Sequence, residues 1–142
     1  MSSVSSLEER LLPLFSEAQV LFSNDFPSFK FNVWSSAVGS KTQYQGHNLG
    51  LECIFPDAAD HEADCVAVSV GTMHLTTEPR ICEACVEWGA GEHPGPQVEL
   101  IPIPLPLLPE AIEDVASKVP TLLAVFRLAL EGWLQRRSQP TL

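Results

Sequence analysis

The sequence is poor in basic residues, and this scarcity limits the partners that it can bind. Only 8 of the 142 residues are Lys or Arg, against 18 Asp or Glu, so the formal net charge is −10. Surfaces that bind nucleic acids or anionic membranes need clustered cations. The charge therefore counts against both kinds of partner. A cationic protein, a metal cation or simple solubility remains as its explanation.

The sequence also lacks a signal peptide and a membrane-spanning segment. Its N-terminus has neither a basic region nor a long apolar stretch. Its most apolar segment, within residues 120–137, contains Arg127 and is shorter than the roughly 18 residues that a span needs. We therefore expect a cytoplasmic protein with no membrane partner. In that reducing compartment the four cysteines are expected to be free thiols.

Motifs that carry catalysis or metal binding are missing. The chain has no P-loop, no dinucleotide-binding glycine motif and no Gly-x-Ser-x-Gly sequence. Asp60, Glu62 and Asp64 have the initial spacing of a calcium loop, but Cys65 and Gly71 replace its required Gly and Glu. We therefore predict no metal, no cofactor and no catalytic residue. An enzyme whose residues are distant in the sequence would escape this search.

The cysteines are interpreted as structural. Cys82 and Cys85 form a Cys-x-x-Cys pair, but residues three apart on a strand point to opposite faces and cannot share one zinc ion. No helix follows them to activate a redox pair. We expect Cys82 to be buried. The hydrophobic register of their strands should place Cys53 and Cys65 on opposite faces, so we expect no disulfide between them.

Two helices are predicted, one near each end of the chain. The first begins near Leu7, and Pro13 either kinks it or marks its start. The second begins at Pro109, is kinked at Pro120 and continues to Arg137. Its apolar residues cover most of its circumference, which is typical of a helix buried between two partners. They form a first stripe of Leu122, Phe126, Ala129, Leu130, Trp133 and Leu134, and a second stripe of Ala124, Val125, Leu128 and Gly132.

Between the helices the apolar residues alternate with a period of two, which predicts strands. The strands are expected at Phe29–Trp34, Tyr44–Phe55, Cys65–Leu75, Ile81–Trp88 and Val98–Ile101, with a turn at Val38–Ser40. Short connections between them favour an antiparallel meander. We predict a single α+β domain over residues 1–142, with four or five strands and with both helices packed on one face of the sheet.

The strand alternation also predicts a polar face on the side of the sheet away from the helices. Its residues would be Lys30, Asn32, Trp34, Glu52, Ser69, Glu83, Cys85, Glu87 and Glu99. This face would be acidic, with Trp34 as an exposed aromatic. An ordinary solvated sheet face is the simplest interpretation of this pattern. The functional interpretation is a docking surface for a basic protein partner, with Trp34, Glu52, Glu83, Glu87 and Glu99 as its binding residues. Such a protein would be a noncatalytic inhibitor, chaperone or immunity-type factor.

Two further possibilities stay open. The protein could instead bind a small molecule, or act as an enzyme, in a pocket between sheet and helices lined by Trp88 and Trp133. The proline-rich segment 101–110 is expected to be an extended connection and not a central strand. Its Ile101, Ile103, Leu105 and Leu107 could also form a partner groove or a dimer contact. A homodimer would use this segment or the second stripe of the last helix.

Overall fold

The computed structural model describes residues 4–40, 44–54, 65–74, 79–88, 98–99 and 105–138. In chain order these form α1 (Val4–Asp25), β1 (Lys30–Ser40), β2 (Tyr44–Ile54), β3 (Cys65–His74), β4 (Pro79–Trp88), β5 (Val98–Glu99), β6 (Leu105–Pro106) and α2 (Pro109–Ser138). Strands β1 to β5 follow one another in the sheet as an antiparallel meander. The predicted α+β fold is confirmed.

The edge of the sheet beside β4 is shared by two short strands. β5 pairs with one end of β4 through Cys85 and Glu99, and β6 pairs with the other end through Ile81 and Leu105. Pro106 lies in β6, at an edge position where its missing N–H costs no ladder hydrogen bond. The described part of the proline-rich segment is therefore extended and peripheral, as predicted.

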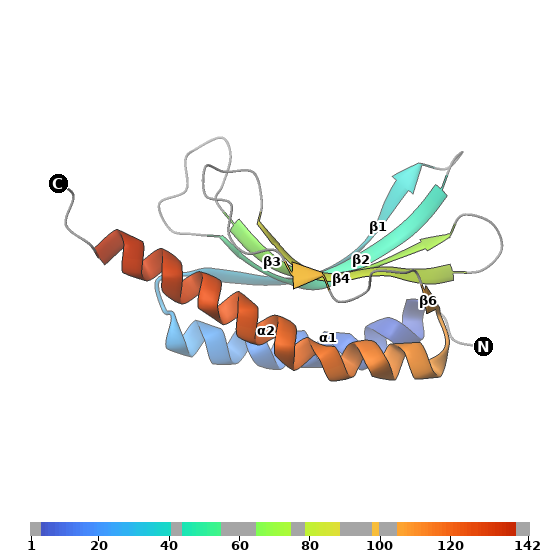
Figure 1. The fold of residues 1–142 in the computed structure, drawn as a ribbon, viewed down its shortest axis with the longest axis horizontal. Coiled ribbons are helices and arrows are strands. Elements are labelled where there is room, and N and C mark those ends of the chain that lie inside the picture. The colour runs from blue at the N-terminus through green and yellow to red at the C-terminus, as the bar shows by residue number, and fades with distance from the viewer. Residues whose placement is uncertain are drawn as a thin grey trace.

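The helices form a second layer on one face of the sheet (Figure 1). α1 contacts β1 and β2, whereas α2 contacts β3 and β4. The two helices lie side by side and run in the same direction, because ion pairs join Arg10 to Glu113 near their first turns and Asp25 to Arg127 some four turns later. Figure 1 also shows that the hairpin of β1 and β2 bends away from the helices.

The core fills the space between the two layers. Strands β2 and β3 contribute alternate side chains with zero exposure, such as Leu49, Leu51 and Val68. Beside them lies an aromatic cluster in which Phe22 is 5.5 Å from Phe126, and Phe29 is 5.3 Å from Trp133, between ring centroids. Of the first stripe of α2, all members are buried except Leu134, which is 39% exposed. Leu134 lies beyond Arg127, where α1 has ended and no longer covers it.

Both predicted helices contain their proline. α1 begins at Val4 and continues through Pro13, so the prediction that Pro13 marks its start was wrong, and α2 is one 30-residue helix that contains Pro120. An internal proline removes one helical hydrogen bond. Both prolines are exposed, so that water can bind the carbonyl group that loses its donor. The predicted turn at Val38–Ser40 was also wrong, since β1 stays paired with β2 as far as Ser40.

A β-bulge in β4 overturns the prediction for its cysteines. The register between β3 and β4 shifts at Gly71 and Thr72, and Cys82 is left without a paired residue. Ile81 consequently enters the core with zero exposure, while Cys82 is only half-buried and its thiol donates a hydrogen bond to the Gly71 carbonyl oxygen at 3.3 Å. Cys85, which was predicted on the polar face, is buried there.

Candidate protein-binding surface

The face of the sheet opposite the helices carries the residues predicted to bind a partner. The strand register aligns Trp34 with Gly50, Ser69, Cys85 and Glu99 in one row across the sheet. A second row contains Glu52, Ala67 and Glu87, and a third contains Asn48, Gly71 and Glu83. The structure thus brings the five predicted residues onto adjacent rows of one face. For Glu99, only the backbone belongs to the described part.

The centre of this face is built from small residues. Gly50, Ala67, Ser69, Gly71 and Cys85 are all buried, with at most 9% exposure for the three that have side chains. Trp34 covers one end of this floor: a Cβ atom on Gly50 would lie 2.8 Å from its ring atom Cη2. Trp34 is therefore half-buried, not exposed as predicted. We call this small-residue floor and the larger side chains around it the trough.

Three carboxylates surround the floor of the trough. Glu52 and Glu87 lie on either side of Ala67, two strand spacings or roughly 10 Å apart. Asn32 Nδ2 donates a hydrogen bond to Glu52 Oε1 at 3.5 Å. The Glu83 side chain lies over Gly71, where an added Cβ would be 2.9 Å from its Oε1. The arrangement can receive cationic groups on both sides of a shallow, small-residue floor.

Two cations lie on the same face at its opposite ends. Lys30 is at one end of the face, where it pairs with Ile54. Arg80 is at the other end, where it pairs with Met73. The sequence missed Arg80, because its side of the sheet is set by the bulge that follows it. Both residues are exposed. The carboxylates therefore occupy the middle of the face, between two cationic corners.

The structure also joins three polar residues on the helix side of the sheet, which the sequence did not reveal. Ser35 of β1 lies between Glu8 of α1 and His47 of β2. Its hydroxyl oxygen is 2.8 Å from Glu8 Oε2 and 2.6 Å from His47 Nε2. These three residues are far apart in the sequence, and none belongs to a motif. A Ser, a His and a Glu in contact raise the question of nucleophilic catalysis.

The geometry of this cluster does not activate the serine. In a catalytic triad the acid binds the second ring nitrogen of His, and His accepts the serine proton. Here the single hydroxyl proton of Ser35 is donated to Glu8, so His47 Nε2 must donate to Ser35. Glu8 Oε2 lies 4.0 Å from that same Nε2 atom. The hydrogen bonds of this cluster link α1 to β1 and β2.

The thiols of Cys53 and Cys82 are not activated either. Burial raises the pKa of Cys53 to about 12, with smaller contributions from Cys65 and Glu52. The pKa of Cys82 is also raised, chiefly by burial and then by the neighbouring Glu83 carboxylate. Nucleophilic cysteines have lowered pKa values instead. Among the described residues, no group of three or more His, Cys, Asp or Glu is placed to hold a metal ion.

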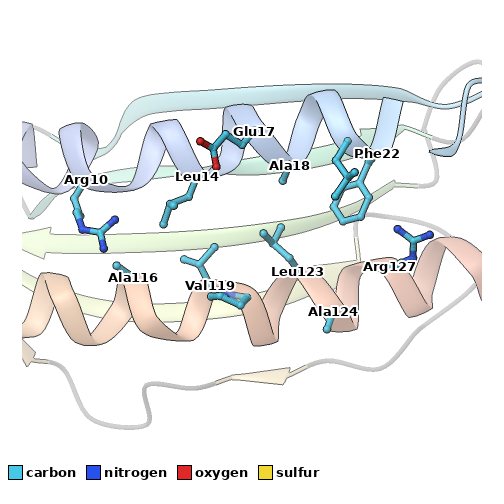
Figure 2. Close-up of a pocket in the computed structure, with 12 residues that line it drawn as sticks. Arg10, Leu14, Glu17, Ala18, Phe22, Ala116, Val119, Leu123, Ala124 and Arg127 are labelled. Atoms are coloured by element: carbon cyan, nitrogen blue, oxygen red, sulfur yellow. The ribbon is translucent and has the colours of Figure 1, made fainter. Parts of the chain in front are cut away.

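A groove runs between the two helices on the side away from the sheet (Figure 2). Its volume is about 470 Å³, and its lining is mostly apolar. Figure 2 shows Leu14 of α1 and Leu123 of α2 pointing into the space between the helices, with Arg10 and Arg127 at its ends. The sequence did not predict this groove. The lining includes Leu21, which is 54% exposed.

The predicted alternative site between sheet and helices is partly described. Trp133 is 5% exposed and packs edge-on against Phe29 within the core, where the neighbouring Leu130 and Phe126 have zero exposure. The Trp88 side chain lies outside the described part of the structure. These residues fill the layer on the Trp133 side.

Comparison of the chain with protein-family models, with curated proteins and with solved structures gives no match. Within the described ranges, no helix is both long and apolar enough to cross a membrane. The function therefore has to be argued from the surfaces themselves.

Proposed function

We propose that this protein is a noncatalytic binding module that docks a basic segment of a partner protein in the trough. The observation that carries the proposal is the strand register, which places Glu52, Glu83 and Glu87 around a floor of small residues beside Trp34. A cationic segment would place its Lys or Arg side chains beside these carboxylates on binding. Trp34 would supply the aromatic anchor that protein interfaces commonly use.

The side chains of the trough favour an occupant with both apolar and basic groups. Gly50 and Gly71 have no side chain, and Ala67, Ser69 and Cys85 have short ones, so Trp34 and the Glu side chains stand above the floor and are the surface that a partner would meet. An extended segment would direct apolar side chains to Trp34 and Lys or Arg side chains to the carboxylates. We therefore expect recognition of an extended segment with alternating basic and apolar residues.

The overall charge supports fast capture of such a segment. A net charge of −10 attracts a cationic partner over a distance that salt limits to about 10 Å at 0.1 M ionic strength. Contacts with carboxylates at the trough then select the orientation. Affinity is expected to fall as salt is added, chiefly through slower association.

The test is fluorescence anisotropy with a labelled peptide of alternating Lys and Leu. The test variant replaces Glu52, Glu83 and Glu87 with Gln. A matched control replaces the exposed Glu9, Glu17 and Glu110 of the helix layer with Gln and changes the net charge equally. The trough variant should weaken binding at least about tenfold, against less than about threefold for the control. Equal weakening by both variants, or no binding by the unmodified protein, would contradict the proposal.

A further inference from the structure

The outer surface of the helix layer, on the side away from the trough, is apolar in its middle and charged at its ends. Between Arg10 and Asp25, Glu17 is the one charged residue of α1, and α2 has no charge from residue 119 to residue 126. Leu21 is 54% exposed and Leu128 is 65% exposed on this surface. Charge depletion at the centre with charges at the rim is typical of a protein–protein interface.

The rim charges follow a pattern with two signs on each helix. At one end Arg10 of α1 pairs with Glu113 of α2, with 2.9 Å between Nε and Oε1. At the other end Asp25 of α1 pairs with Arg127 of α2, with 2.8 Å between Oδ2 and Nη1. In these two pairs α1 supplies first the cation and then the anion, and α2 supplies first the anion and then the cation. The four ion-paired residues are therefore complementary to themselves after a two-fold rotation.

We propose that the helix layer pairs with the helix layer of a second copy of the chain, around a two-fold axis parallel to the helices. α1 would then lie on α2 of the second copy, and α2 on α1. Arg10 would face Glu113 of the second copy, and Arg127 would face its Asp25. Each of these four ion-paired residues meets the opposite sign, as a self-complementary two-fold interface requires.

Two axes would bring opposite charges together at the ends of the helices, one parallel to the helices and one across them. The position of Glu17 favours the parallel axis. Rotation about an axis across the helices would also match opposite charges, but it would place the two copies of Glu17 together at the centre. Rotation about an axis along the helices places Glu17 against the uncharged stretch 119–126 of α2. Like charges in an interface are costly, so the parallel axis is the favoured one.

Side-chain sizes also match in this arrangement. The two intrachain ion pairs join residues 103 and 102 positions apart, which sets the level of α1 against α2. At that offset Ala124 lies level with Leu21 of the second copy. The exposed leucine would meet a small residue, and the grooves of Figure 2 would close over a shared core of four helices.

The area is sufficient for a stable dimer. Two adjacent helices, about 20 Å wide together and about 33 Å long over α1, present roughly 660 Å² in projection. A standard interface buries roughly 800 Å² on each partner, which a corrugated surface of this outline can supply. The dimer would leave both sheets outside, with their troughs facing away from each other. The inference goes beyond the proposed function and does not depend on it.

Light scattering after size exclusion tests the pairing. The unmodified protein is expected at twice its 15.5 kDa chain mass at micromolar concentration. Ala124→Arg, which puts a charge at the centre of the helix layer, should give a folded monomer. Ser36→Arg adds the same charge to the exposed opposite face and should stay dimeric. A monomeric unmodified protein, or a dimeric Ala124→Arg variant, would overturn the inference. If Ala124→Arg does not fold by circular dichroism, Thr121→Arg replaces it.

Charge reversals at the rim test the orientation. Arg10→Glu should raise the dissociation constant of the dimer about tenfold, because it sets two like charges against each other. Adding Glu113→Arg should restore it. Glu17→Gln should leave the constant within about threefold of the unmodified value. Marked tightening by Glu17→Gln, or no rescue by Glu113→Arg, would overturn the proposed orientation. Fluorescence anisotropy measures peptide binding at the trough independently of dimerisation, so failure of one proposal is distinguishable from failure of the other.

Discussion

The two faces of the sheet are made from the same strands, but one carries large side chains and the other carries small ones. On the helix side, β2 and β3 contribute Leu49, Leu51, Val66 and Val68, all with zero exposure. On the other side, the same strands contribute Gly50, Ala67, Ser69 and Gly71. The first face is stabilised by the apolar volume that it buries, and the second depends on having little volume. Substitutions should therefore act in opposite senses on the two faces.

The helix-side face should show the largest effect. Phe126→Ala removes a fully buried ring that lies 5.5 Å from Phe22 and 6.3 Å from Phe31, between centroids. We expect the free energy of unfolding to fall by about 3–5 kcal/mol, from lost burial and the cavity left behind. Urea denaturation followed by circular dichroism measures the change. Leu128→Ala, on the exposed side of the same helix, should change it by less than about 0.5 kcal/mol when both variants are measured in the monomeric Ala124→Arg background. Similar losses in both variants would contradict the layer assignment.

The trough face should respond to added volume. A Cβ on Gly50 would lie 1.9 Å from the Val68 carbonyl oxygen, which is backbone and cannot rotate away, and 2.8 Å from Trp34. Gly50→Ala should therefore lower the free energy of unfolding by about 1–3 kcal/mol. The control is Gly132→Ala in α2, where no atom lies within 4 Å of the new Cβ. It should raise stability by about 0.5–1 kcal/mol, because alanine suits a helix better. A neutral Gly50→Ala would show that the floor is not closely packed.

The comparison of faces also explains what the sequence could predict. Alternation with a period of two depends on each residue's own polarity, so it predicted the strands and the register that separates Cys53 from Cys65, in which Leu51 pairs with Val68. The short connections predicted the antiparallel order. The same alternation placed Trp34, Glu52, Glu83 and Glu87 on one face. It did not predict that Trp34 lies over Gly50, because that depends on the depth of the floor.

The missed features depend on relations that a local pattern does not contain. The bulge at Cys82 adds one residue to β4 without any change in composition, so Ile81 enters the core and Cys82 is only half-buried. Ser35 contacts Glu8 and His47 across 27 and 12 residues of sequence. The exposed positions of the prolines, which let the helices continue, follow from the packing of the layers. Each of these features follows from tertiary structure and not from local sequence preference.

The smallest predicted effect concerns the thiol on the helix side of the sheet. Burial raises the pKa of Cys53 from about 9 to about 12, so the folded protein keeps this proton where the unfolded chain loses it. The unfolded state then binds fewer protons, and stability should fall as the pH rises from about 9 towards 12. Urea denaturation at about pH 8 and about pH 10 should show this loss in the unmodified protein and a smaller one in Cys53→Ala. Cys65→Ala, at the half-exposed position beside it, should keep most of the loss, because burial and not the neighbouring thiol is the main cause. An equal pH dependence in Cys53→Ala and the unmodified protein would show that Cys53 titrates as freely as an exposed thiol, and that the core beneath β2 admits water.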